Sequence, residues 1–311
     1  MTAHPDRRDI LAGLAAVAAA AVTGTAMAAS AKGSFLVVGD WGRDGASHQL
    51  DVAAQMEKAA EEYGAKFIVS VGDNFYSNGV QSTSDPQWKT SFEDVYTGDH
   101  LQCPWYVVLG NHDYRGVPQA QIDYTRQSTR WRMPERYYKV AGFDIGSPNI
   151  DIFVIDSSPL VHEYAAKTGM LGDNVKGQDT GAQLAWLDAQ LGKSSAKFKL
   201  VFGHHTMFSG GSGHGNTPEM IERVLPILKK HGVLAYVNGH DHDLQHIKRD
   251  GINVVCSGAG SEVRPVAVVE GTKFCLSQSG FSIFTVTQDA VTIEFRNHLG
   301  STVYSAVLSS I

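Results

Sequence analysis

The sequence predicts one mixed α/β domain in which two β-sheets pack face to face and helices cover their outer faces. Short apolar runs alternate with helix-period segments through most of the chain, and the last third changes to hairpin-like strands. No internal repeat or low-complexity linker follows the N-terminal segment. With 311 residues, 43% of them apolar and 19% charged, the chain can bury a substantial core and is too apolar to be disordered.

The N-terminus has the features of a targeting segment. Arg7 and Arg8 precede an uncharged, alanine-rich stretch at 10–28, which ends in the Ala-Met-Ala pattern that signal peptidases cut. A transmembrane anchor is the alternative, but alanines are weakly hydrophobic and glycines interrupt the stretch. We therefore expect 1–28 to be a twin-arginine-type signal peptide and 29–311 to be the mature, folded domain. The protein would then be periplasmic or secreted, with no stable membrane insertion after cleavage.

The N-terminal half is organised as β-α units. An apolar run at 34–38 precedes a segment at 48–63, whose apolar residues recur at helical spacing until Gly64 ends it. A second run, 67–71, precedes a helical segment at 85–95, where a proline suits the first turn. Because strand-helix-strand units place their strands in parallel, the sheet core should be parallel in part.

The remaining elements follow the same rules. Strands are expected at 105–109, 151–155, 199–202 and 233–237, helices at 181–191 and 218–231, and hairpin strands at 252–256, 281–287, 291–296 and 302–308. The connection at 159–180 is polar and rich in glycine. A structureless connection of that length is usually functional or mobile.

Charge and cysteine content exclude several classes of protein. The net charge of -6 argues against a generally basic surface that would hold a nucleic-acid scaffold. Three scattered cysteines are too few for a disulfide-built fold or a cysteine-rich metal site. Cys256 and Cys275 can be either a disulfide or two free thiols. The chemistry must come from other side chains, and the thirteen histidines stand out.

Five polar clusters come directly after predicted strands. They are Gly39-Asp40-Trp41-Gly42, Gly72-Asp73-Asn74-Phe75-Tyr76, Gly110-Asn111-His112-Asp113, Gly203-His204-His205 and Gly239-His240-Asp241-His242. One Gly-Asp pair after a strand is usually only a turn. Carboxyl ends of parallel strands, however, meet at one rim of an α/β sheet, where ligands bind. Carboxylate, phenol, amide and imidazole groups without a thiolate suit a two-metal site rather than a structural zinc.

The five clusters, in this order, resemble the purple acid phosphatases, a family of binuclear metallophosphoesterases. The family pattern is GDxG, GDxxY, GNH followed by an acidic residue, VxxH and GHxH, and here it spans 40–242. Tyr76 is the narrower signal, because the family uses this phenolate to bind ferric iron. The runs at 183–187 and 239–245 are similar to those of the small, mammalian-type members. The resemblance implies the four-layer metallophosphoesterase sandwich.

The resemblance also implies the metal ligands. One ion would be held by Asp40, Asp73, Tyr76 and His242, and the other by Asp73, Asn111, His204 and His240. Asp73 would bridge them. Carboxylates and a phenolate favour Fe(III), whereas an amide and two imidazoles suit a divalent ion such as Fe(II), zinc or manganese. His205 is an alternative to His204 as a ligand, although the VxxH spacing favours His204.

The implied reaction is hydrolysis of phosphate monoesters at acid pH, with inorganic phosphate as a product. The two ions would hold the phosphoryl oxygens while metal-bound hydroxide attacks phosphorus. His112 and His214 match family positions near the phosphate and the leaving group, where an imidazole can donate a hydrogen bond or proton. The segment 159–180 resembles a family loop that covers the active site.

Two alternatives remain at the sequence level. The motifs define the metals and not the alcohol, so a phosphodiesterase or a nucleotidase on the same fold is possible. The other alternative is an exported metal-binding or phosphate-binding protein without turnover. The complete ligand set and the intact His112 argue against that second alternative.

Overall fold

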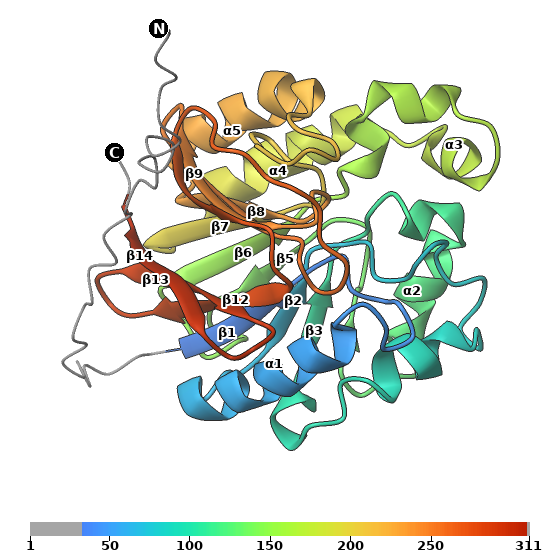
Figure 1. Cartoon of the computed structure of the whole chain (residues 1–311). Coiled ribbons are helices and arrows are strands. Elements are labelled where there is room, and N and C mark those ends of the chain that lie inside the picture. Colours follow the sequence, from blue (N-terminus) through green and yellow to red (C-terminus); the bar gives the residue numbers. More distant parts are fainter. Residues whose placement is uncertain (1–32, 310–311) are drawn as a thin grey trace, which may run out of the picture.

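The computed structural model describes residues 33–309. They form two seven-stranded β-sheets with helices on the outer faces (Figure 1), which confirms the expected fold class. The expected signal peptide lies outside the described residues. None of the helices within 33–309 combines the length and apolar character needed to cross a bilayer.

The first sheet joins the N-terminal strands to the last three. Its strands are β1 (Gly33–Val38), β2 (Ile68–Ser70), β3 (Trp105–Val107), β4 (Trp131–Arg132), β12 (Gly280–Val286), β13 (Val291–Asn297) and β14 (Thr302–Leu308). They lie in the order β14-β13-β12-β1-β2-β3-β4. Strands β1 to β4 are parallel, and the other pairs are antiparallel. The parallel strands β1 and β2 are buried almost throughout, as sheets covered on both faces require.

The second sheet is formed by the middle of the chain. Its strands are β5 (Tyr138–Ala141), β6 (Ile150–Val154), β7 (Phe198–Phe202), β8 (Ala235–Asn238), β9 (Leu244–Arg249), β10 (Ile252–Ser257) and β11 (Thr272–Leu276). They lie in the order β11-β9-β10-β8-β7-β6-β5, with β6, β7, β8 and β10 parallel. The rings of Phe35 on β1 and Phe202 on β7 meet edge to face, 6.4 Å apart, between the sheets.

The helices lie outside this core. They are α1 (Gln49–Tyr63), α2 (Pro118–Tyr124), α3 (Met170–Val175), α4 (Thr180–Lys193) and α5 (Leu225–Lys230), with π-helical turns at Trp88–Glu93 and Met220–Val224. Helix α1 covers the first sheet, whereas α4 and α5 lie on the opposite side of the molecule (Figure 1). Helix α1 ends where Gly64 adopts a left-handed conformation, with φ of 58°.

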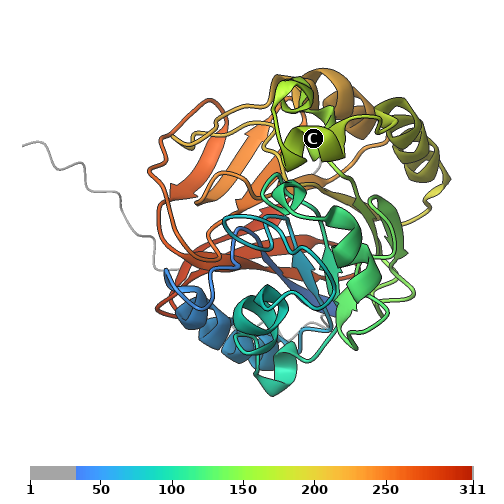
Figure 2. The ribbon, with the colours of Figure 1, turned by 90° about the vertical axis from the view of Figure 1, so that its right-hand side faces the viewer.

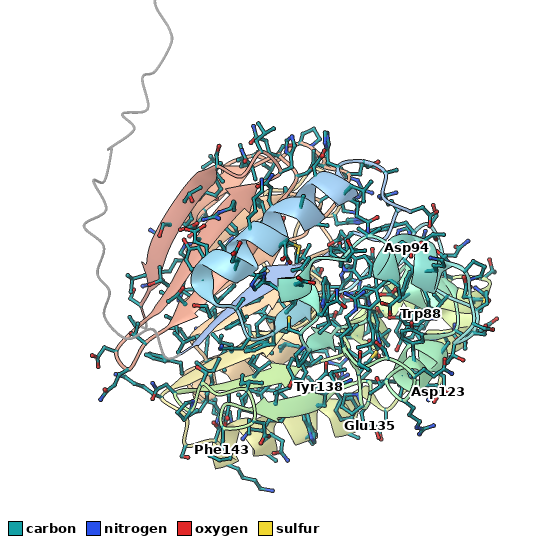
Figure 3. The ribbon with its side chains drawn as sticks, turned by 90° about the horizontal axis from the view of Figure 1, so that it is seen from below. Trp88, Asp94, Asp123, Glu135, Tyr138 and Phe143 are labelled. Atoms are coloured by element: carbon teal, nitrogen blue, oxygen red, sulfur yellow. The ribbon has the colours of Figure 1, made fainter. Side chains whose placement is uncertain are left out.

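Figure 3 views the molecule from the side of α1. The helix lies along the strands of the first sheet and buries Val52, Met56 and Ala59 on one face. This arrangement agrees with the apolar spacing in the sequence. Phe143 follows β5, the edge strand of the second sheet, and its side chain is 86% exposed.

Two expectations need correction, and the structure adds the placement of the expected C-terminal strands in the two sheets. The helix expected at 85–95 is only a π-helical turn at Trp88–Glu93. The connection at 159–180 is not structureless, because it contains the 3₁₀ helix His162–Ala166 and all of α3. The hairpin strands near the C-terminus divide between the two sheets, since β10 joins the second sheet and β12 to β14 join the first.

The cysteines in the second sheet are free thiols. Cys256 on β10 and Cys275 on β11 both lie opposite Gln245 of the strand between them. Two strand spacings separate their Cα atoms by roughly 10 Å. A disulfide requires less than about 7 Å, so this pair cannot form one without a movement of the backbone.

Candidate metal centre and active site

The five polar clusters follow five parallel strands and lie at one rim of the two sheets. Asp40, Asp73 and Asn111 come after the neighbouring strands β1, β2 and β3, and His204 and His240 come after the neighbouring strands β7 and β8. Figure 2 faces the side of the molecule where α2 and α3 lie in Figure 1. The side-chain contacts below bring the two sets of clusters together across the gap between the sheets.

The backbone around these residues is strained. Asp40, Asp73 and His240 have φ of 59°, 50° and 73°, a region that residues with a side chain rarely adopt. Each such conformation costs about 1–3 kcal/mol and is typical of functional sites. The glycines keep space free, since a Cβ atom at Gly110 would collide with Asp73 and one at Gly239 with Asp40.

The first group of candidate ligands surrounds the hydroxyl of Tyr76. This oxygen lies 2.9 Å from Asp40 Oδ1, 3.0 Å from Asp73 Oδ2 and 3.0 Å from His242 Nε2. Asp40, Asp73 and His242 are buried, and Tyr76 is partly exposed. The four residues expected at the ferric position therefore converge on one point.

The second group surrounds Nε2 of His204. This nitrogen lies 3.2 Å from Asn111 Oδ1, 3.2 Å from His240 Nδ1 and 3.4 Å from Asp73 Oδ2. On the other side of the ring, Nδ1 donates to the carbonyl of Val71 at 2.9 Å. A carbonyl can only accept, so Nδ1 carries a proton and Nε2 is the nitrogen that faces the group.

Asp73 is the residue common to both groups. Its Oδ2 contacts the hydroxyl of Tyr76 and Nε2 of His204, while its Oδ1 accepts a hydrogen bond of 2.7 Å from the backbone of His112. Both oxygens are therefore held in position. This is the place that a carboxylate shared between two ions would occupy.

The pKa values reflect this crowding of buried charge. Burial raises the pKa of Tyr76, and the carboxylates of Asp40 and Asp73 raise it further. Burial alone would also raise the pKa of Asp73, but the imidazoles of His204 and His112 hold it well below its usual range. Burial opposes protonation of His204, yet Asp73 and Asp40 raise its pKa to about 9. Burial raises the pKa of Asp40 well above its usual range, so a cation in the cluster would favour the ionised form of this carboxyl group.

The residues present fit a metal centre. Ligand atoms of Asp40, Asp73 and His204 lie within 4.8 Å of one another, and all three residues are buried. Between residues 33 and 309, neither carboxylate forms an ion pair with a lysine or arginine. Buried charges are normally paired or bind metals, and cations would compensate these two. His242 Nδ1 is also buried without a hydrogen-bond partner.

His112 and His214 lie beside this centre. The ring of His112 packs on Tyr76, with centroids 4.5 Å apart, and its Nδ1 donates to the carbonyl of Ser77 at 2.6 Å. The ring of His214 stacks on His240 at 3.8 Å. Arg264 donates to Nε2 of His214 at 3.2 Å, which leaves the proton of the neutral ring on Nδ1.

His205 has a different environment from His204. Its ring bonds to Ser157 at 2.8 Å through Nδ1 and to the hydroxyl of Tyr164 at 3.0 Å through Nε2. Both of its nitrogens are therefore occupied by hydroxyl groups, whereas Nε2 of His204 faces Asp73. The geometry favours His204 as the ligand and makes His205 the support of the segment that carries Tyr164.

Acidic neighbours of the candidate ligands hold the loops. Asp113 accepts hydrogen bonds from the backbone of Gly110 and of Asn74. Asp241 accepts from the backbone of His214 at 2.9 Å. Asp113 also accepts from the side-chain amide of Gln121, so its partners are N–H donors that hold the loop.

Sequence reasoning missed three arginines that adjoin the centre. The guanidinium of Arg43 lies 3.9 Å above the ring of Tyr76, Arg115 lies beside His112, and Arg264 bonds to His214. They come from loops far apart in the sequence and belong to no spaced motif. Their only sequence signal is that Arg43 and Arg115 stand within four residues of a candidate ligand.

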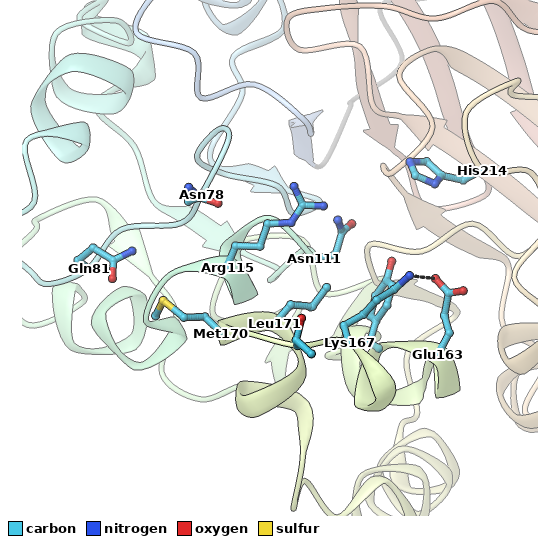
Figure 4. A pocket seen from close by; sticks show the side chains of 11 residues that line it. Asn78, Gln81, Asn111, Arg115, Glu163, Lys167, Met170, Leu171 and His214 are labelled. Atoms are coloured by element: carbon cyan, nitrogen blue, oxygen red, sulfur yellow. Dashed lines mark ion pairs between the residues drawn. The ribbon is translucent and has the colours of Figure 1, made fainter.

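A cavity of about 680 Å³ opens beside the centre (Figure 4). Asn111 and His214 line it on the side of the candidate ligands. The segment expected to cover the site supplies much of the opposite wall, with Tyr164, Lys167 and Leu171. The segment at 159–180 is therefore a wall of the cavity.

Comparisons with known proteins show the family of the chain. The family model described as calcineurin-like phosphoesterase matches residues 33–244. Purple acid phosphatase 17 of Arabidopsis thaliana is 39% identical over 289 residues, which cover 89% of this chain and 84% of the relative. Tartrate-resistant acid phosphatase type 5 of Homo sapiens is 36% identical over 243 residues, 74% of each chain.

Solved structures share the fold. GAP50 of Plasmodium superposes with a TM-score of 0.76 at 24% identity, over 90% of this chain and 89% of that one. The purple acid phosphatase PPD1 of yellow lupin gives a TM-score of 0.65 at 13% identity, over 89% of this chain and 53% of that one. The chain belongs to the calcineurin-like phosphoesterases and, among them, to the purple acid phosphatases.

Proposed function

We propose that this protein is an exported acid phosphatase that hydrolyses phosphate monoesters at a centre of Fe(III) and a divalent metal ion. The observation that carries the proposal is the position of Asp73, whose Oδ2 contacts both groups of candidate ligands. The complete set is Asp40, Asp73, Tyr76, Asn111, His204, His240 and His242. When bound, such a centre supplies charge to hold the phosphoryl oxygens and to activate water.

The donor types support different ions at the two positions. Around Tyr76, two carboxylates and a phenol provide hard anionic oxygen, which suits Fe(III). Around His204, an amide oxygen and a second imidazole are neutral donors, which suit Fe(II), zinc or manganese. Because its environment raises the pKa of Tyr76, only a strong Lewis acid would keep this group as a phenolate.

The two histidines beside the centre would handle the substrate. Nδ1 of His112 already donates to the carbonyl of Ser77, so Nε2 is the nitrogen left for the substrate, and it can donate to a phosphoryl oxygen when the ring is protonated. Nε2 of His214 accepts from Arg264, so its Nδ1–H is the donor available for the leaving oxygen. Both assignments rest on which ring nitrogen already has a partner.

The reaction class is tested with a monoester and a diester of the same alcohol. Purified, metal-loaded protein should hydrolyse 4-nitrophenyl phosphate far faster than bis(4-nitrophenyl) phosphate, with highest activity at acid pH. Faster hydrolysis of the diester would identify a phosphodiesterase instead. Absence of turnover on either ester, with the metals bound, would identify a binding protein.

Export follows from the twin-arginine segment at 1–28. Expression of the full chain in a bacterium with a twin-arginine pathway should give a periplasmic protein that begins near Ala29. Replacement of Arg7 and Arg8 by lysine should retain the protein in the cytoplasm with an intact N-terminus. N-terminal sequencing of each fraction distinguishes cleavage from membrane anchoring.

Tyr76→Phe should remove the colour of the protein. A phenolate on Fe(III) gives a ligand-to-metal charge-transfer band, and phenylalanine has no oxygen to provide it. Most of the metal should remain, because Asp40, Asp73 and His242 keep their positions around the lost hydroxyl. A colourless wild-type protein that contains stoichiometric iron would contradict the assignment of Tyr76.

Mild trypsin should cut the segment at 159–180 first, at Lys167 or Lys176. The side chains of these residues are 53% and 54% exposed, and residues 165–170 form a continuous exposed run. Because this segment lines the cavity, cleavage should alter activity while the rest of the domain stays folded. Mass spectrometry of the fragments checks the site, and initial cleavage elsewhere contradicts the prediction.

A further inference from the structure

We infer that Arg115 binds a second negatively charged group on the substrate, so that the enzyme prefers phosphate monoesters whose alcohol carries a carboxylate or another phosphate. This inference rests on the proposed phosphatase activity and adds the class of leaving group. Two observations support it: a cavity lies beside the centre, and the guanidinium of Arg115, which lines this cavity, has no hydrogen-bond acceptor or carboxylate partner among the described residues.

The position of the cavity makes it the space for a leaving group. It is lined by Asn111, a candidate metal ligand, and by His214, which we place near the leaving oxygen. Its volume of about 680 Å³ is within the range of small-molecule sites. Figure 4 shows Arg115 between Asn78 and Asn111, on the wall opposite the segment that carries Lys167.

Arg115 has no acceptor that satisfies its charge. Its closest polar contact is from Nη1 to Nδ1 of His112, at 3.2 Å. That nitrogen already donates to the carbonyl of Ser77 at 2.6 Å, so it cannot also accept from a guanidinium. Over the described range 33–309, no carboxylate lies within ion-pair distance of Arg115.

The two other arginines at the centre differ in this respect. Arg43 forms an ion pair of 3.3 Å with Glu262, and Arg264 donates to Nε2 of His214. Arg115 is also only partly exposed, so water solvates it incompletely. A guanidinium with five donors, in a cavity and without an acceptor, suits a carboxylate or phosphate, which it can bind through two hydrogen bonds.

The rest of the cavity fits a small polar substrate. Lys167 on the covering segment already has a partner, Glu163, at 3.8 Å, and this pair is the dashed contact in Figure 4. The positive charge of Arg115 therefore remains uncompensated within the cavity. Asn78 and Gln81 offer amides for hydroxyl groups, while Met170 and Leu171 provide an apolar surface for a short carbon chain.

The experiment compares substrates that differ mainly in one charge. The pairs are 3-phosphoglycerate with glycerol 3-phosphate, and 6-phosphogluconate with sorbitol 6-phosphate, which place the carboxylate at two distances from the phosphate. The wild-type protein should show higher kcat/KM for the anionic member of at least one pair. In Arg115→Gln this preference should fall by roughly 10- to 100-fold, the size of a lost charge-assisted interaction.

The ratio of kcat/KM between the two substrates of a pair reports on the proposed contact alone. Arg115 adjoins His112, so its replacement can change both rates, but such an effect cancels in the ratio. Arg115→Lys should retain part of the preference. Arg126→Gln is the matched control, because Arg126 is 83% exposed, pairs with Asp123 and is not among the residues that line the cavity. Its ratio should equal that of the wild-type protein.

Binding without turnover gives an independent measurement. The inhibition constants of 3-phosphonopropanoate and propylphosphonate, which differ by a terminal carboxylate, should favour the former in the wild-type protein and not in Arg115→Gln. A wild-type enzyme that hydrolyses 4-nitrophenyl phosphate, but shows no anionic preference or keeps it in Arg115→Gln, overturns this inference alone. Failure to hydrolyse any monoester would instead overturn the proposed function.

Discussion

Asp73→Ala is expected to lower the occupancy of both metal positions and to lower turnover by more than about 10⁴-fold, because two bound ions would supply much of the charge that stabilises the transition state. No other candidate ligand contacts both groups through one oxygen, as Oδ2 of Asp73 does with Tyr76 and His204. The variant also removes the acceptor of the backbone N–H of His112, at 2.7 Å.

His240→Ala is the control for the bridge. His240 Nδ1 lies 3.2 Å from His204 Nε2, in the second group only, so its loss should chiefly empty the divalent position and leave most of the iron. Elemental analysis of both variants, with circular dichroism to verify folding, makes the comparison. If Asp73→Ala retains both ions, the bridging position is wrongly assigned.

His112→Ala and His214→Ala should each keep the metal content and colour and lose turnover by roughly 10²- to 10⁴-fold, the range for a positioned general acid or its equivalent. Metal retention is expected because the backbone bonds of these residues survive the change. The N–H of residue 112 still donates to Asp73, and that of residue 214 still donates to Asp241.

The two variants should differ in their dependence on the leaving group. If Nδ1–H of His214 donates a hydrogen bond to the leaving oxygen, its loss should matter more for glycerol 2-phosphate, a poor alkoxide leaving group, than for 4-nitrophenyl phosphate. If His112 holds the phosphoryl oxygens, its loss should affect both substrates equally. Small and equal losses for both variants on both substrates, with metals intact, would reject these roles.

Much of the fold was predictable because local patterns determine it. The buried apolar runs before Gly39, Gly72 and Gly110 are strands of a parallel sheet, and the left-handed Gly64 ends α1 where the sequence indicates. Some of the elements that were missed or misjudged are short, such as β4 with two residues and the π-helical turn Trp88–Glu93, although β9 with six residues was missed as well. Tertiary packing rather than local preference forms such pieces.

The candidate ligands were predictable for a related reason. They follow strand ends, and the topology of parallel sheets brings strand ends to one rim. The residues that hold the candidate site histidines in position could not be predicted in this way. Arg264 reaches His214 from an irregular loop, and Tyr164 reaches His205 from the 3₁₀ helix His162–Ala166, and neither residue belongs to a spaced motif. Only the packed arrangement of the loops shows that Arg115 lacks an acceptor.

The most direct test of the central claim is the metal content of the purified, active wild-type protein. Elemental analysis should find two metal ions per chain, one of them iron, and loss of 4-nitrophenyl phosphatase activity should follow the removal of either ion by a chelator. Full activity in protein that holds fewer than two ions, or none of which is iron, would contradict the Fe(III)–divalent centre built around Asp73.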